Sequence, residues 1–142
     1  MKIYIGNDHT AVEMKEKICK YLKDNNYDVV DLGTNTSQAV DYPDFGTDVA
    51  RKVVEDNALG IVICGSGIGI SIAANKIKYA RAALCHEDKA AEMARKHNNA
   101  NILALGARVI AIEKAIDIVK TFLTTSFEAD RHVKRVKKLD NL

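Results

Sequence analysis

The chain has 142 residues, 47% of them hydrophobic, and a formal net charge of +2. This length and composition suit one globular domain with a sizeable core, and the balanced charge argues against nucleic-acid binding through a whole-molecule field. An odd count of three cysteines and the lack of a charged-then-apolar leader favour a reducing, cytoplasmic setting over a disulfide framework.

The first half of the chain predicts alternating strands and helices. The apolar run at 2–6 suits a strand, and apolar residues at helical spacing over 11–22 suit a helix with one buried stripe. Residues 27–33 are typical of a second strand, and residues 44–55 of a second helix. The nearly all-apolar stretch 59–64 predicts a strand that is covered on both faces.

The alternation continues in the second half. A helix is predicted at about 67–77, a strand at 81–85, a helix at 87–97 and a strand at 101–106. The next helix is marked by apolar residues at helical spacing, namely Ile112, Ile116, Val119 and Leu123. A final basic helix is expected from about Asp130.

Repeated strand–helix units predict an α/β fold, a three-layer, doubly wound parallel sheet with helices on both faces. We expect residues 1–142 to form a single domain with a C-terminal helix. Ligands of such sheets bind beyond the carboxyl ends of the strands, where the strand order reverses. The functional site is therefore expected after Ile5, Cys64, Cys85 and Leu105.

The stretch 57–75 carries no charge and is nearly as long as a membrane span. It contains four glycines and two serines, which suit a strand, a turn and a helix better than a span. No membrane segment is predicted.

The sequence ICGSGIGISIAANK, residues 63–76, places glycines directly after the predicted strand at 59–64. Gly65, Gly67 and Gly69 would let backbone N–H groups approach an anion at the start of a helix. The spacing matches neither a dinucleotide fingerprint nor a P-loop, so nucleotide binding is disfavoured. A tight turn that serves only packing remains the alternative for this feature.

Cys64 ends the predicted strand immediately before this turn. A cysteine on a buried strand is more often a small hydrophobe, and we expect that role for Cys19 and Cys85. At Cys64, however, a helix N-terminus would favour the thiolate. A thiolate that faces backbone donors combines a base or nucleophile with a loop that binds an oxyanion.

Other polar clusters each allow two interpretations. Asp8 and His9 should lie on the carboxyl edge, although Asp8 suits capping of the next helix equally well. His97 ends a predicted helix, where a solvated histidine gains from the helix dipole without any catalytic role. Arg131 and Arg135 share one helix face and could grip a phosphate, or could belong to a solvated basic helix.

Two further classes of site have little support in the sequence. The cysteines and histidines show no paired ligand spacing, so no metal site is predicted. Residues 131–138 are locally basic, but no aromatic or base-reading pattern accompanies them, which leaves nucleic-acid binding as a weak alternative.

Five blocks of the sequence together resemble the signature blocks of type B ribose-5-phosphate isomerases. These blocks are GNDHTAVEMK, DYPDF, CGSGIGISIAANK, RKHNNANILALGARV and RHVKRV, and the similarity runs from Met1 to about Val136. The wider sugar-phosphate isomerase family includes allose-6-phosphate and galactose-6-phosphate isomerases. The resemblance implies a Rossmann-like fold and interconversion of ribose 5-phosphate and ribulose 5-phosphate without a metal or other cofactor.

By this resemblance, Cys64 is the base that moves a proton between C1 and C2 through an enediolate. His97 corresponds to the acid that opens the furanose ring, and Ser66 is a further catalytic position. The backbone N–H groups of 65–69 would hold the enediolate oxygens. The positions implied to contact the substrate are Asp8, His9, Gly65, Ser66, Gly67, Ile68, Gly69, Asn98, Arg108, Arg131 and Arg135.

The resemblance also bears on assembly and substrate. Members form dimers or tetramers with shared active sites, so a homodimer or homotetramer is expected. Galactose-6-phosphate isomerase combines two subunit types, one without the loop cysteine and the other without the histidine and the C-terminal arginines. This chain keeps Cys64, His97, Arg131 and Arg135, which favours a pentose-phosphate isomerase. The alternatives are an allose-6-phosphate or galactose-6-phosphate isomerase, or a non-catalytic sugar-phosphate sensor.

Overall fold

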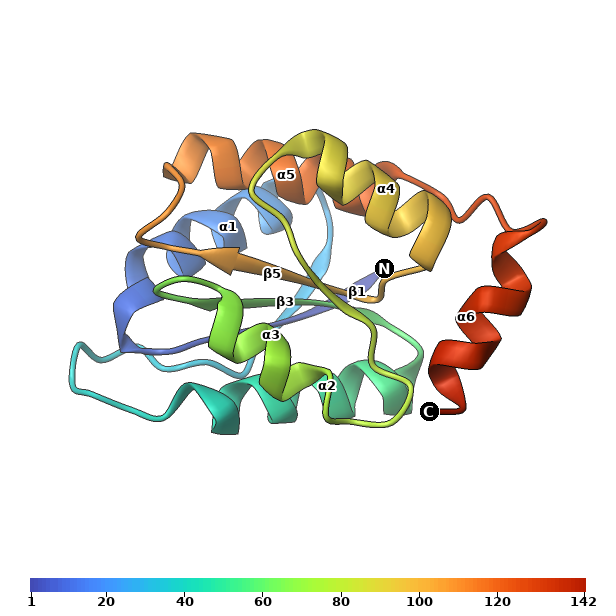
Figure 1. The fold of residues 1–142 in the computed structure, drawn as a ribbon. Helices are drawn as coiled ribbons and strands as arrows, with labels where there is room; N and C mark the ends of the chain where they lie inside the picture. The colour runs from blue at the N-terminus through green and yellow to red at the C-terminus, as the bar shows by residue number, and fades with distance from the viewer.

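The computed structural model describes all 142 residues and contains one five-stranded parallel sheet with helices on both faces (Figure 1). The strands are β1 (Lys2–Asn7), β2 (Asp28–Asp31), β3 (Leu59–Cys64), β4 (Ala82–Leu84) and β5 (Ile102–Gly106). Their order is β2-β1-β3-β5-β4, and every neighbouring pair is parallel. The predicted three-layer α/β fold is confirmed.

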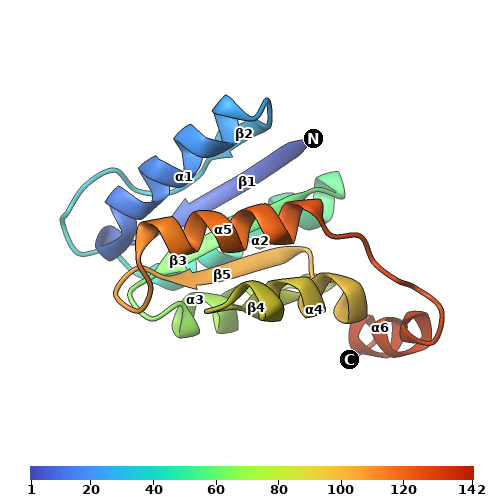
Figure 2. The same ribbon diagram turned by 90° about the horizontal axis from the view of Figure 1, so that it is seen from above.

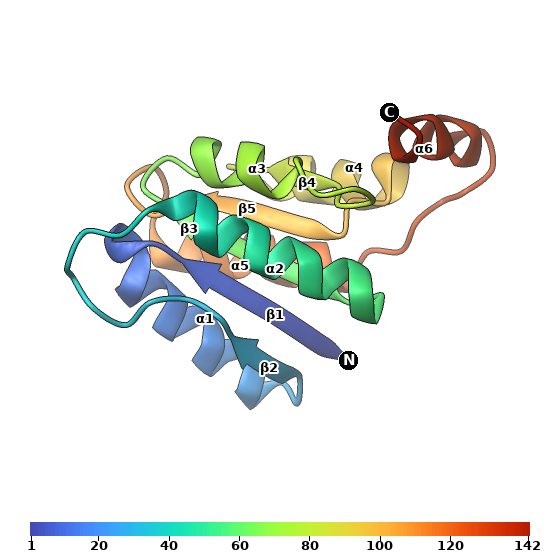
Figure 3. The ribbon, with the colours of Figure 1, turned by 90° about the horizontal axis from the view of Figure 1, so that it is seen from below.

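The helices divide between the two faces of the sheet. On one face lie α1 (Val12–Asp24), α4 (Asp88–Asn98) and α5 (Ile112–Thr124), as Figure 2 shows. On the other face lie α2 (Tyr42–Asp56) and α3 (Ile68–Ala74), as Figure 3 shows. A short 3-10 turn, η1 (His9–Ala11), precedes α1, and α6 (His132–Asp140) is the predicted C-terminal helix.

The core is split by the sheet into two apolar layers because successive strand residues point to opposite faces. Ile3 and Ile5 of β1 belong to the apolar layer that includes α1, α4 and α5, whereas Tyr4 belongs to the layer that includes α2 and α3. All three positions are buried, as are the central residues of β3 and β5. Full burial of each large apolar side chain contributes about 1.5–3 kcal/mol.

Among the helix boundaries that differ from the sequence prediction, two have a clear local cause. Helix α2 begins at Tyr42, earlier than expected, because Pro43 occupies the first helical turn, where its missing N–H costs nothing. Helix α3 ends at Ala74, and the chain turns away there with tight backbone bonds from the N–H groups of Lys76 and Ile77. None of the helices has the length and apolar character that crossing a membrane requires.

Helix α6 lies beyond the amino ends of the strands (Figure 1), the opposite end of the sheet from the β3–α3 turn. Its last turn is attached to the start of β4 by an ion pair, in which Arg81 Nη1 lies 2.9 Å from Asp140 Oδ1. Both side chains are largely buried, which makes this pair a firmer attachment than an exposed one.

Candidate active site

The carboxyl ends of β1 and β3 meet where the strand order reverses, which is the expected place for a ligand. The backbone N–H of Asp8 donates to the carbonyl of Ile63 at 3.1 Å, so the loop after β1 touches the end of β3. From the loop after β5, the N–H of Arg108 donates to the carbonyl of Gly65 at 2.9 Å. The structure therefore brings Asp8, Cys64 and Arg108 to one edge, as the sequence predicts.

The Cys64 thiol is enclosed by the turn that joins β3 to α3. Its side chain is 4% exposed, and Sγ accepts a hydrogen bond from the N–H of Gly67 at 3.2 Å. Gly67 reaches this position with a φ of 78°, in the left-handed region that glycine adopts without strain. A backbone N–H donor is therefore already in place beside the sulfur.

The rest of the glycine-rich turn, residues 65–69, follows Cys64 directly in the chain. The hydroxyl of Ser66 accepts a hydrogen bond from the N–H of Ile68 at 3.1 Å. Two of the N–H groups expected to hold enediolate oxygens, those of Gly67 and Ile68, thus bond to the thiol and to Ser66 in this structure.

The remaining two cysteines are core residues. Burial raises the pKa of the Cys85 thiol to about 11, and burial together with nearby Asp31 raises the pKa of Cys19. Neither thiol forms a thiolate readily at neutral pH, so both are packing groups, as expected.

A Gly67→Ala variant is expected to lose stability. The added Cβ would lie 2.6 Å from Leu84 Cδ1 and 2.9 Å from the carbonyl oxygen of Leu105, at a φ that alanine avoids. We expect a loss of at least about 1–3 kcal/mol in the free energy of unfolding, measured by urea denaturation. Gly65→Ala is the matched control, since its Cβ would meet no atom closer than 3.6 Å. Equal urea midpoints for the two variants would contradict the requirement for glycine at 67.

Asp8 and His9 are held by different partners on the same edge. Asp8 is buried and caps η1, because its Oδ1 accepts hydrogen bonds from the N–H and the hydroxyl of Thr10 at 3.0 and 2.6 Å. His9 Nδ1 accepts a hydrogen bond from the N–H of Val40 at 3.1 Å. A neutral His9 then carries its proton on Nε2, which makes that nitrogen a donor for an anionic group.

The loop that fixes His9 is itself anchored by a buried lysine. Lys15 is 1% exposed, and its Nζ donates to Asp31 Oδ2, the carbonyl of Thr34 and Asn35 Oδ1 at 2.8, 3.1 and 2.6 Å. All three ammonium donors therefore have acceptors, which offsets the cost of burying the charge. Nothing in the sequence singles out this lysine, because its pattern is that of any charged residue on an amphipathic helix.

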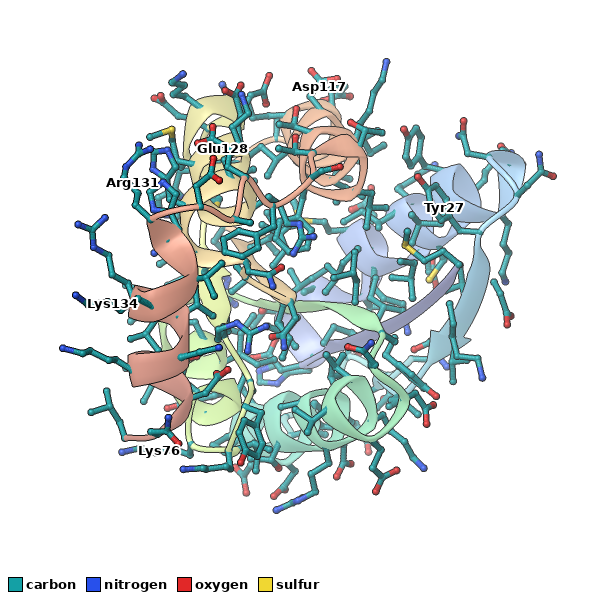
Figure 4. All side chains as sticks on the ribbon, turned by 90° about the vertical axis from the view of Figure 1, so that its right-hand side faces the viewer. Tyr27, Lys76, Asp117, Glu128, Arg131 and Lys134 are labelled. Atoms are coloured by element: carbon teal, nitrogen blue, oxygen red, sulfur yellow. The ribbon has the colours of Figure 1, made fainter.

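The remaining predicted residues lie at the opposite edge of the sheet. Helix α4 returns from the carboxyl ends to the amino ends of the strands, so His97 and Asn98 in its last turn lie at the amino edge (Figure 1). Arg131 and Arg135 belong to α6 and its N-cap, at this same edge (Figure 4). One chain by itself therefore keeps Cys64 apart from these four residues.

A cavity of about 570 Å³ also lies at the amino edge, between α6 and the start of β4. Asn98 and Asp140 are among its lining residues, and the glycine-rich turn is not. The cavity therefore belongs with the amino-edge residues and not with the thiol.

The amino-edge cluster contains a histidine that the sequence did not single out. The rings of His97 and His132 are stacked, with centroids 4.4 Å apart and planes inclined by 15°. Glu128 Oε1 lies 3.8 Å from His132 Nε2. In the sequence, His132 looks like one more polar residue of a basic helix, and only the path of the chain brings it to His97.

The ligand atoms of His97, Glu128 and His132 lie within 4.8 Å of one another, so the geometry of a shared metal ion has to be considered. Sequence spacing does not reveal the group, because His97 lies far from Glu128 and His132 in the sequence. A bound ion lies in the plane of each imidazole that ligates it, and two stacked, nearly parallel rings offer no common position of that kind. The arrangement fits a histidine pair better than a shared ion.

Burial lowers the pKa of His132, and the positive charges of Arg131, His97 and Arg135 lower it further, against an opposing effect of Glu128. The unfolded chain, with an ordinary histidine pKa of about 6.5, therefore takes up a proton at this position before the folded chain does. Stability from this group is complete above about pH 6.5 and is lost as the pH falls toward the lower, folded pKa.

We therefore expect the urea midpoint to fall between pH 7 and pH 5.5, and to fall less in a His132→Phe variant. The exposed His86 supplies the control, since His86→Phe should leave the pH dependence unchanged. The same slope in the parent and in His132→Phe would show that other groups cause the loss.

Exposed apolar side chains lie next to the glycine-rich turn. Ile68 and Ile72 of α3 are 53% and 55% exposed, and Tyr42 at the start of α2 is 40% exposed. The Tyr42 ring packs over Gly69, where an added Cβ would lie 2.5 Å from it. Apolar groups gathered beside a polar site are typical of a surface that another protein covers.

Comparisons with known proteins find relatives that match nearly the whole chain. The family described as Ribose/Galactose Isomerase matches residues 3–139. A probable ribose-5-phosphate isomerase B of Mycoplasma genitalium is 46% identical over 140 residues, which cover 96% of this chain and 92% of the relative. The solved structure of Clostridium thermocellum ribose-5-phosphate isomerase B is 50% identical, with a TM-score of 0.97 over 99% of this chain and 96% of that chain. A structure of ribose-5-phosphate isomerase B from Mycoplasma genitalium with bound ribulose-5-phosphate is 43% identical, with a TM-score of 0.95 over 99% and 94% of the two chains.

Proposed function

This chain belongs to the ribose/galactose isomerase family, and from that membership we propose that residues 1–142 form one domain that interconverts ribose 5-phosphate and ribulose 5-phosphate. The observation that carries the proposal is the buried Cys64 thiol, which accepts the Gly67 N–H at the strand switch point. A thiolate at this place can act as a base beside backbone donors that stabilise an oxyanion.

The reaction follows from this geometry. The Cys64 thiolate takes the proton from C2 of the open aldose, which leaves an enediolate, and returns a proton to C1. Ser66, on the same turn, is assigned to the enediolate oxygens, where a proton must leave O2 and reach O1. The turn 65–69 supplies backbone N–H groups to the same oxygens. No metal or other cofactor is required for these steps.

Binding is assigned to residues of both edges. Asp8, His9 and Arg108 act with the turn 65–69 from the carboxyl edge, and the Nε2–H of His9 suits a phosphate or sugar oxygen. From the amino edge, His97 is the acid that opens the furanose ring, and Asn98, Arg131 and Arg135 hold the substrate. The two arginines, one helical turn apart, suit the phosphate group.

Two sets of residues at opposite edges can meet only if a second copy brings its amino edge to the first copy's Cys64. We therefore assign this chain to a homodimer with two shared sites, or to a homotetramer built from such dimers. Ile68 and Ile72, exposed beside the glycine-rich turn, supply an apolar contact for the second copy. We place the enzyme in the cytoplasm, since its three cysteines are free and buried, as a reducing compartment favours.

The test is conversion of ribose 5-phosphate to ribulose 5-phosphate by the purified chain in EDTA, with allose 6-phosphate and galactose 6-phosphate assayed beside it. We expect fast pentose conversion that EDTA does not reduce. Conversion of only a hexose phosphate would move the assignment to that substrate. Saturable ribose 5-phosphate binding without conversion would identify a sensor and overturn the proposal.

A further inference from the structure

His132 is a buried titratable residue that the proposed chemistry does not use. The residue is 6% exposed, and its Nε2 has no hydrogen-bond partner. It is the first residue of α6, where its backbone N–H donates to the carbonyl of Ala129 at 2.9 Å. A buried imidazole with an unpaired nitrogen lowers the stability of the fold, so a functional role is a reasonable explanation for a histidine at this position.

The contact that its ring makes is with His97. The two imidazoles are stacked at 4.4 Å between centroids, and His97 is only half-buried. One face of the His97 ring is therefore covered by His132, while the residue remains partly accessible to a ligand. Stacking on a fixed ring removes rotational freedom from the covered imidazole.

The ring of His132 is fixed because both ends of its segment are attached to the body of the protein. The N–H of Glu128 donates to the carbonyl of Lys96 at 3.1 Å, and Arg95 Nε donates to the carbonyl of Thr125 at 3.2 Å. The far end of α6 is attached by the Arg81–Asp140 ion pair described above. Figure 4 shows Glu128 and Arg131 near the start of this helix.

We infer that His132 is a positioning residue for His97, whose ring it holds by stacking in the orientation needed to protonate the ring oxygen of a furanose. This inference rests on the proposed function of His97. The lowered pKa of His132 is consistent with it, since a neutral ring can cover a protonated imidazole without adding a second positive charge.

The test compares two aldoses in each of several variants. Ribose 5-phosphate must be opened before isomerisation, whereas 4-deoxyribose 5-phosphate has no 4-hydroxyl with which to close a furanose ring. The analogue still needs Cys64 but not a ring-opening acid. The ratio of kcat/KM for the two substrates therefore reports ring opening alone. Both rates come from one preparation, so the ratio does not depend on the fraction of protein that is folded.

The variants distinguish an effect of a stacked ring at position 132 from an effect of side-chain volume alone. His132→Leu keeps the volume but removes the ring, and we expect the ratio to fall about 10-fold or more. His132→Phe keeps a stacking surface, and its ratio should stay within about 3-fold of the parent's. Val136→Ala is the matched control, because Val136 is buried one turn further along α6 and does not stack on His97. Its ratio should equal the parent's.

Three outcomes would overturn the inference: a parental ratio in His132→Leu, a ratio in His132→Phe as low as in His132→Leu, or an equal fall in Val136→Ala. His97→Asn separates these failures from failure of the proposed function. We expect its ratio to fall about 100-fold. An unchanged ratio in His97→Asn would show that His97 is not the ring-opening acid. If the ratio fell in His97→Asn but stayed at the parental value in His132→Leu, His97 would still be the acid and only the role of His132 would be wrong.

Discussion

Replacement of Cys64 by alanine is expected to lower the rate of pentose-phosphate isomerisation by about 10³-fold or more, since it removes the base assigned to the C2 proton. The backbone that surrounds the thiol should remain in place, because glycine adopts the left-handed conformation seen at Gly67 without strain. Cys64→Ala should therefore fold, assemble and bind ribose 5-phosphate. The measurements are turnover in a direct assay and substrate affinity by calorimetry.

Cys85→Ala is the control for loss of a buried thiol. Cys85 is 1% exposed within the core, and its pKa of about 11 leaves it protonated, so its replacement should reduce stability slightly and leave kcat unchanged. If Cys64→Ala kept substantial turnover, the assignment of the base would be wrong. If both variants lost activity together, the cause would be folding and not chemistry.

Mixing two inactive variants is expected to restore activity. In a dimer that combines a Cys64→Ala chain with a His97→Asn chain, one site receives both mutations and the other receives neither. Random reassociation gives mixed dimers in half of the population, each with one intact site, so about a quarter of the parental activity should return. The measurement is turnover after the two proteins are unfolded together in urea and refolded.

The control mixture pairs Cys64→Ala with Ser66→Ala, two changes in the same half of the site. Every site in these mixed dimers carries one of the two defects, so mixing should add nothing to the activity of the Ser66 variant alone. Sites built within single chains would leave the first mixture as inactive as its components. That result would contradict the shared site and would require a rearrangement that joins the two edges of one chain.

The sequence predicted the sheet and one half of the site because both depend on local patterns. Strands that are buried on both faces appear as continuous apolar runs, and the carboxyl ends of parallel strands share one edge, so the neighbourhood of Asp8, Cys64 and Arg108 follows from strand positions alone. The turn after β3 was likewise indicated by the glycine spacing, whereas the left-handed conformation of Gly67 is seen only in the structure.

Features that depend on the path of the chain could not be predicted in this way. Hydrophobic periodicity does not show that β5 lies between β3 and β4, because β4 and β5 are both short and apolar. The stack of His97 and His132 depends on how the segment before α6 crosses the end of α4. The separation of His97 from Cys64 follows from the return of α4 to the amino edge, which the order of motifs along the sequence conceals.

The two outer strands have a consequence for how copies of this chain can associate. β2 and β4 have only four and three residues, and β2 begins and ends with an aspartate. Short outer strands and charged side chains oppose the addition of a strand from another molecule. The sheet is therefore poorly suited to extend from one copy into the next by strand pairing, which protects the protein from uncontrolled polymerisation. Copies that associate as proposed would then do so through helix surfaces, where growth stops once two equivalent faces have covered each other.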